Sequence, residues 1–189
     1  MKLRIDPDVF TQLVDLNTTR RCNDCDVCCT ALEVFDLQPP KKIGERCQHQ
    51  CNDKAGCQIY DNRPKSCKEF YCTWRMAEVI KIFIPNRLKP SKCGFVLSWD
   101  PMVNPVLMTL FKDPKRPDAW KKYKRELEAI AKENNVCIGI GGGYDATHVL
   151  SPRGNWFDRK LFPWLFNGLS VGVPREEFNN GRPNKRWGH

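Results

Sequence analysis

The chain has 189 residues, of which 41% are hydrophobic and 28% charged, and a formal net charge of +9. Six Trp and ten Phe residues need a buried core, so the composition excludes a disordered chain. No run approaches about 18 consecutive apolar residues, and the first residues contain no apolar signal segment. We therefore expect a cytoplasmic protein of one domain, or one domain with a small lobe, and no membrane partner.

The first predicted element is a short helix over residues 6–17. Asp6 can cap this helix, Pro7 suits its first turn, and apolar residues recur at helical spacing after them. Residues 1–19 are therefore interpreted as an N-terminal helical segment that precedes the cysteine-rich part of the chain.

Nine of the eleven cysteines lie between residues 22 and 72. Packing gives a fold no reason to collect nine thiols in one segment, whereas soft-metal ligation does. Disulfides are less favoured, because the cysteine count is odd and cytosolic thiols stay reduced. We expect residues 20–84 to form an irregular module with short helices that metal organises. The candidate metal ligands are Cys22, Cys25, Cys28, Cys29, Cys47, Cys51, Cys57, Cys67 and Cys72.

The spacing Cys22-x-x-Cys25-x-x-Cys28 lets three thiolates converge on one centre, as in ferredoxin-type iron–sulfur proteins. Cys29 follows directly, and neighbouring side chains diverge, so we hypothesise that Cys29 turns to a second centre. Nine thiols suffice for two four-coordinate sites with one spare. His49 is a weaker candidate ligand, for which a surface position is the simpler interpretation.

The metal itself stays open between zinc and an iron–sulfur cluster. The three-cysteine run and the presence of only three His favour iron–sulfur slightly, although all-thiolate zinc sites fit equally well. Two zinc ions held by eight thiolates would lower the net charge from +9 to about +5. Part of the basic excess therefore compensates a metal site in this interpretation.

Residues 75–84 are mostly apolar and predict a helix at the edge of the cysteine module. The next two apolar runs, residues 94–99 and 106–111, predict strands of an antiparallel hairpin. Cys93 and Cys137 lie in apolar strand contexts, so we expect both to be core thiols.

The clearest helical pattern covers residues 118–134, with apolar residues on one face and Lys and Glu on the other. Residues 136–140 predict a strand, residues 141–143 a glycine turn, and residues 148–150 a further short strand. After residue 152 the chain is rich in Pro, Gly and Trp and is expected to be irregular.

Together these elements predict an α+β protein with a small antiparallel sheet and one amphipathic helix. The predicted parts are the N-terminal helix, the cysteine module to residue 84, an α+β lobe over residues 85–178, and a frayed tail over residues 179–189.

The cysteine order, together with a conspicuous stretch after it, resembles the CxxCxxCC (YkgJ-type) cysteine-cluster family, which is described as a zinc- or iron-chelating domain. Asp26 replaces the glycine that is common after the second cysteine of the cluster. The resemblance covers about residues 20–76 and implies metal binding without naming a reaction. The residues that match the stretch are Gly56, Cys57, Ile59, Tyr60, Arg63, Pro64, Cys67 and Phe70.

Two residues of this stretch are candidates for contact with the bound metal or cluster. Arg63 would neutralise thiolate charge or donate a hydrogen bond to sulfur, and Tyr60 would help to shield the metal from water. Local packing explains both residues equally well.

The sequence shows no catalytic set, and three functions stay open. An accessory or structural metal-binding protein comes first, and an iron–sulfur redox or group-transfer enzyme second, because a flagellin lysine methylase carries a related cysteine cluster. A nucleic-acid-binding module comes third, since the helix at 118–134 carries basic residues with Trp120 and Tyr123 between them. A solvated helix face is the commoner explanation of that pattern.

Overall fold

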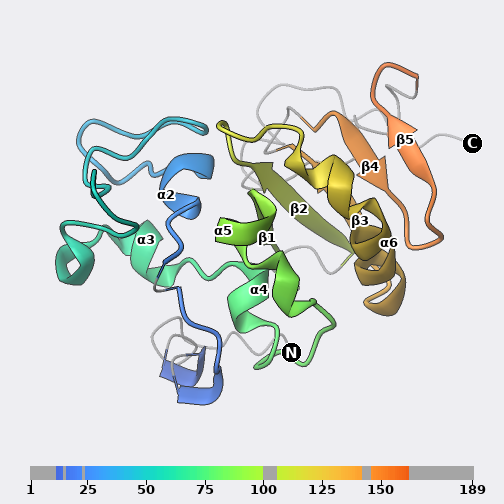
Figure 1. Ribbon diagram of the computed structural model, residues 1–189, viewed down its shortest axis with the longest axis horizontal. Helices are drawn as coiled ribbons and strands as arrows, with labels where there is room; N and C mark the ends of the chain where they lie inside the picture. The colour runs from blue at the N-terminus through green and yellow to red at the C-terminus, as the bar shows by residue number, and fades with distance from the viewer. Residues whose placement is uncertain (1–11, 15, 23, 100–105, 142–145, 162–189) are drawn as a thin grey trace, which may run out of the picture.

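The computed structural model describes residues 12–14, 16–22, 24–99, 106–141 and 146–161. These residues form the predicted α+β arrangement: short helices accompany a five-stranded sheet in the order β1-β2-β3-β4-β5 (Figure 1). Within these ranges, no helix combines the length and the apolar character needed to cross a membrane.

The predicted hairpin is confirmed in β1 (Phe95–Ser98) and β2 (Leu107–Lys112), which pair antiparallel. The residues that join them, 100–105, lie outside the described ranges. Both strands begin with three or four buried residues in succession, which explains why each was recognisable as an apolar run.

The pairing of β3 (Cys137–Ile140) with β2 is parallel and the other three pairings are antiparallel, so the sheet is mostly antiparallel, as predicted, with one parallel pair. The helix between β2 and β3 returns the chain to the edge of the sheet at which β2 begins. β3 therefore runs in the same direction as β2. β4 (His148–Leu150) was predicted and pairs antiparallel with β3. β5 (Trp156–Asp158) was missed, because three half-buried residues carry no periodic signal.

The predicted helix at 118–134 is confirmed in extent and starts with a tighter turn. The 3-10 helix η3 (Ala119–Tyr123) leads directly into α6 (Lys124–Glu133). Leu127, Ile130 and Ala131 are fully buried, as the helical spacing indicated. The helix ends at Asn134, whose side-chain amide nitrogen donates to the Ile130 carbonyl.

The predicted helix at 75–84 was wrong in extent. Only α4 (Thr73–Met76) is helical there, and turns follow it. Lys81 adopts a left-handed φ of 54°, and the Asn134 side chain hydrogen-bonds both the N–H and the carbonyl of Phe83 at 2.9 Å. These backbone groups are therefore held by Asn134 instead of a helical ladder. Of the predicted helix at 6–17, residues 12–14 and 16–17 are helical, and the remainder lies outside the described residues.

Buried residues on both sides of residue 84 share one main core. Trp74, Ala77 and Ile84 pack in the same cluster as Phe95 and Met108. The predicted boundary at residues 84 and 85 therefore crosses a continuous core.

A second, smaller core lies between the cysteines and the sheet. Val27, Ala31 and Val96 form it, and we call it the α2–β1 cluster. In Figure 1, α2 (Cys28–Ala31) and α3 (Lys65–Glu69) lie on the side of α5 (Pro90–Cys93) and β1, away from α6.

Candidate metal centre

Two tight turns and a one-turn helix shape the dense cysteine run. The N–H of Cys25 donates to the Cys22 carbonyl at 2.7 Å, and the N–H of Cys29 donates to the Asp26 carbonyl at 2.8 Å. α2 then begins at Cys28. The two-residue gaps therefore fold as the turns that the sequence spacing predicted.

Four cysteines gather on the side of the α2–β1 cluster. Cys25, Cys28 and Cys72 pack against that cluster. Burial raises the pKa of the Cys72 thiol to about 12, a backbone hydrogen bond from Arg75 opposes the rise, and repulsion from Cys22 and Cys25 adds to it. Cys22, Cys25, Cys28 and Cys72 thus lie close enough for their charges to interact, and we call them the first group.

Four other cysteines gather around the loops that follow α2. The N–H of Cys47 donates to the Cys29 carbonyl at 3.0 Å, which ties these two residues together. Burial raises the pKa of both Cys57 and Cys67, and repulsion from Cys29 and Cys47 contributes in each case. We call Cys29, Cys47, Cys57 and Cys67 the second group.

The adjacent pair Cys28 and Cys29 joins the two groups. The Cys28 thiol donates a hydrogen bond to the Cys29 sulfur, which raises the pKa of Cys28 well above its ordinary value and lowers that of Cys29.

The other three cysteines have different surroundings. Cys51 begins a turn that its N–H closes on the Gly56 carbonyl at 3.1 Å. Cys93 is fully buried in the main core, and its thiol donates to the Leu88 and Phe95 carbonyls at 3.4 Å. Cys137 packs beside Ala146 and Val149, so both predicted core thiols contact apolar residues.

A buried lysine accompanies the second group, and the sequence analysis missed it. Lys41 is 5% exposed, and its ammonium donates to the carbonyls of Thr30, Leu32 and Lys42. Burial lowers the pKa of Lys41, and the strongest opposing attraction comes from Cys47, followed by Cys29. Nothing in the local pattern marks this residue, because a lysine in a polar loop is normally exposed.

Arg63 lies close enough to Cys29 and Cys57 for its charge to act on both thiols. Its charge helps to lower the pKa of Cys29 and opposes the rise at Cys57. The Arg63 guanidinium lies 3.7 Å from the centroid of the Tyr60 ring, and its Nε–H donates to the Tyr60 carbonyl at 2.8 Å. Tyr60 is 52% exposed, so its ring supports Arg63 more than it shields sulfur.

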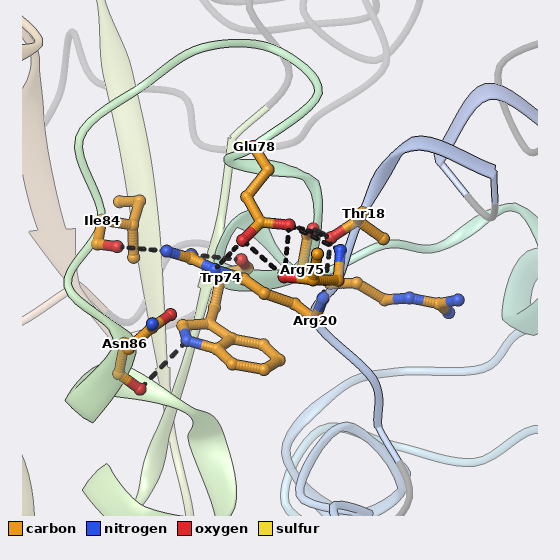
Figure 2. Close-up of polar contacts among 8 residues, drawn as sticks. Thr18, Arg20, Trp74, Arg75, Glu78, Ile84 and Asn86 are labelled. Atoms are coloured by element: carbon orange, nitrogen blue, oxygen red, sulfur yellow. Dashed lines mark hydrogen bonds and ion pairs between the residues drawn. The ribbon is translucent and has the colours of Figure 1, made fainter.

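Polar contacts join the segment before Cys22 to the segment after Cys72, the first and last residues of the first group. Arg20 and Glu78 lie at the centre of these contacts, which we call the Arg20 clamp (Figure 2). Arg20 donates to the Trp74 carbonyl at 2.6 Å and to the Ile84 carbonyl at 2.8 Å, and its guanidinium lies 5.2 Å from the Trp74 ring centroid. Glu78 pairs with Arg20 at 3.5 Å and accepts a hydrogen bond from the Thr18 hydroxyl at 2.9 Å. The segment before Cys22 is thereby held against the helix that follows Cys72.

No three His, Cys, Asp or Glu side chains in the described ranges stand in a metal-holding arrangement. Backbone N–H groups of Val27 and Ser91 donate to the Cys25 sulfur, and that of Ile59 to the Cys57 sulfur. Such bonds stabilise metal-bound thiolates. The ring of His49 lies 3.3 Å from the Gln48 amide.

No family model, no curated protein and no solved structure matches this chain. The resemblance to the CxxCxxCC proteins therefore stays a prediction, and the candidate site rests on its own chemistry.

Proposed function

We propose that this chain is a metal-binding protein that holds an iron–sulfur cluster or zinc through cysteine thiolates, in an accessory or structural role. The observation that carries the proposal is Lys41. A buried ammonium is costly unless an anion compensates it, and the groups that attract Lys41 are Cys47, Cys29, the carboxylate of Glu45 and Cys28. Metal-bound thiolates at Cys47 and Cys29 would add to the negative charge that Glu45 supplies.

The chain's own residues prepare the site for soft metal. All nine clustered cysteines are half-buried, so their sulfurs are sheltered and still within reach of an entering ion. A bound cluster would supply redox or Lewis-acid chemistry, and bound zinc would supply structural cross-links. Arg20, Lys41 and Arg63 balance the negative charge that thiolates bring.

The test is metal analysis of protein purified without oxygen. Brown protein with matching iron and sulfide supports a cluster, and colourless protein with stoichiometric zinc supports zinc sites. The matched control is Cys137→Ser, which removes a thiol outside both groups. Protein that retains neither metal, and takes up neither on reconstitution, would refute the proposal.

A cavity beside α2 keeps the enzyme alternative open. It has a volume of about 290 Å³ and is lined by polar groups that include Asp26, Thr30, Gln50 and Arg116. Because α2 also carries Cys28 and Cys29, a small polar substrate in this cavity would lie near the metal. Binding of such a substrate that depends on metal would favour the enzyme over the accessory role.

The nucleic-acid alternative draws on a shallow basic depression. Its cationic lining residues are Arg87, Lys121, Lys122, Lys124 and Arg125. Two of these are paired with carboxylates, Lys121 with Asp118 at 2.9 Å and Arg87 with Glu126 at 3.0 Å, which reduces the charge available to phosphate. Binding that did not weaken with added salt would remove this alternative.

A further inference from the structure

We propose that the cavity beside α2 is a binding site for a small free zwitterion of the amino-acid type, with an ammonium group at one end and a carboxylate at the other. Asp26 takes the ammonium group, and Lys115 and Arg116 take the carboxylate. This ligand site lies beside the cysteines and does not require any of them to bind metal.

The cavity lies between the cysteine-rich segment and the sheet. One wall comes from the residues around α2 and from Gln50, and the second comes from α5 and from the turn that follows β2. Its volume of about 290 Å³ is at the lower end of the range for small-molecule pockets. The cavity therefore suits a compact molecule with few atoms.

Asp26 is held on the first wall by a buried chain of hydrogen bonds. The Gln50 amide nitrogen donates to Asp26 Oδ2 at 2.6 Å, and the Thr30 hydroxyl donates to Gln50 Oε1 at 3.2 Å. Thr30 and Gln50 are only 8% and 7% exposed, so this wall is fixed before a ligand enters. The Oδ1 atom of Asp26 accepts no hydrogen bond from the described residues, which leaves it available to an ammonium group.

Arg116 is held on the second wall by contacts that use only part of its guanidinium. Its Nε donates to Asp113 Oδ2 at 3.0 Å, and its Nη1 donates to the Ser91 carbonyl at 3.2 Å. Asp113 is 6% exposed, and its Oδ1 accepts from the backbone N–H of Lys115 at 3.0 Å. Among the described residues Nη2 has no acceptor, so this end of the fork is available to a carboxylate.

Gly94 makes room for this arginine. Its φ is 78°, and a Cβ at this position would lie 3.1 Å from Nε and 3.2 Å from Cζ of Arg116. The Gly94 carbonyl accepts from the N–H of Asp113 at 3.1 Å. The backbone at residue 94 thus fixes both members of the Asp113–Arg116 pair, and the position of the guanidinium is set in advance.

Ser91 adds a hydroxyl that points to a ligand. This residue lines the cavity, and its hydroxyl is buried without a hydrogen-bond partner among the described residues. Buried hydroxyls are normally hydrogen-bonded, because an unsatisfied one keeps its full desolvation cost. Since the carbonyl of the same residue binds Arg116, a carboxylate at Arg116 is placed to accept from this hydroxyl as well.

The charges of the lining select the class of ligand. Asp26 and Asp113 balance Lys115 and Arg116, so the lining has no net charge. Asp113 is already engaged by Arg116, which leaves the carboxylate of Asp26 and the exposed ammonium of Lys115 for the ligand. A ligand with a single charge would meet only one of them, whereas a zwitterion complements both.

The experiment is calorimetric titration of the purified protein with straight-chain ω-amino acids from glycine to 6-aminohexanoate. This series varies the distance between the ammonium and carboxylate groups. We expect one chain length to bind best, and to bind at least about tenfold more tightly than the carboxylic acid or the alkylamine of the same length.

Two variants and one control connect the binding to the proposed contacts. In Asp26→Asn the best amino acid should bind no more tightly than the matching carboxylic acid. In Lys115→Met, which changes an exposed residue, it should lose about tenfold in affinity while the alkylamine is unaffected. Lys122→Met changes an exposed lysine outside the cavity and should leave the affinity unchanged.

Four outcomes overturn the proposal. A carboxylic acid that binds as well as the amino acid would indicate an anion site only, and an equally tight alkylamine would indicate a cation site only. No binding across the whole series, or equal losses in Lys115→Met and Lys122→Met, would show that the cavity is not such a site. Metal analysis of the same protein tests the proposed metal binding separately, so either proposal can fail without the other.

Discussion

The Arg20 clamp allows the sharpest test of what holds the cysteine-rich segment in place. Replacing Arg20 by Met keeps an apolar side chain beside Trp74 but removes both hydrogen bonds to backbone carbonyls. Hydrogen bonds from charged groups contribute roughly 1.5–3 kcal/mol each, and the contact with the Trp74 ring about 0.5–1 kcal/mol. The Arg20 side chain is 11% exposed, so solvent replaces little of this. We expect the free energy of unfolding to fall by about 3 kcal/mol.

The assay is urea unfolding of the purified protein followed by tryptophan fluorescence. Arg87→Met is the matched control, because Arg87 also pairs with a glutamate but is 67% exposed. Exposed ion pairs contribute less than about 1 kcal/mol, so the control should lose that much at most. Arg20→Met should also make Cys22 and Cys72 more reactive to alkylation than Cys47. An equal loss of stability in both variants, or a loss below about 1 kcal/mol for Arg20→Met, would refute the reasoning.

Three further predictions concern charge, pH and metal removal. Lys41→Met should weaken metal retention against a chelator by roughly tenfold, which corresponds to about 1.4 kcal/mol and is less than adjacent unit charges contribute at an effective dielectric of about 20. Lys42→Met, at an exposed neighbour, should leave retention unchanged, and equal effects would contradict the role of Lys41. Burial raises the pKa of Cys93 from 9.0 to about 12. Between these values the unfolded thiol ionises while the folded thiol stays protonated, so stability falls as pH rises. In that window the free energy of unfolding, measured by urea denaturation, should fall by about 1.4 kcal/mol per pH unit in the wild type, and Cys93→Ala should remove this contribution. An unchanged slope would show that Cys93 is not buried as a neutral thiol. Removing the metal should speed hydrogen exchange across residues 22–72 but leave β2 protected, because β2 lies in the main core. Uniform loss of protection would show instead that metal holds the whole fold.

Local patterns predicted those parts of the fold in which burial and periodicity agree. The apolar runs of β1 and β2 are buried on both faces, and Leu127, Ile130 and Ala131 repeat at the spacing of a helix face. The direction of β3 depends on the crossover that precedes it, which no single segment encodes. The irregular backbone at Phe83, within the predicted helix at 75–84, is held by Asn134, which lies about fifty residues away in the sequence.

Some residues of the candidate site could likewise be predicted from the sequence, and others could not. The nine cysteines were predicted as candidate ligands from their number and spacing, since metal ligation requires a particular residue type, and Arg63 was a candidate through the family resemblance. Lys41 was not visible, because its burial follows from how the loop after α2 folds over it. The membership of the two groups was equally hidden, as it depends on Asp36 holding α3 and on Cys47 meeting the Cys29 carbonyl.

The position of β1 at the end of the sheet order gives the cover over this strand a consequence for association between chains. Val96 on β1 packs with Val27 and Ala31, and Ala31 belongs to α2. Terminal strands with apolar surface are sites at which separate chains add to one another. Under the proposed metal binding, loss of the metal would loosen α2 and leave β1 open to such addition, and sedimentation of the metal-free protein would detect growing oligomers.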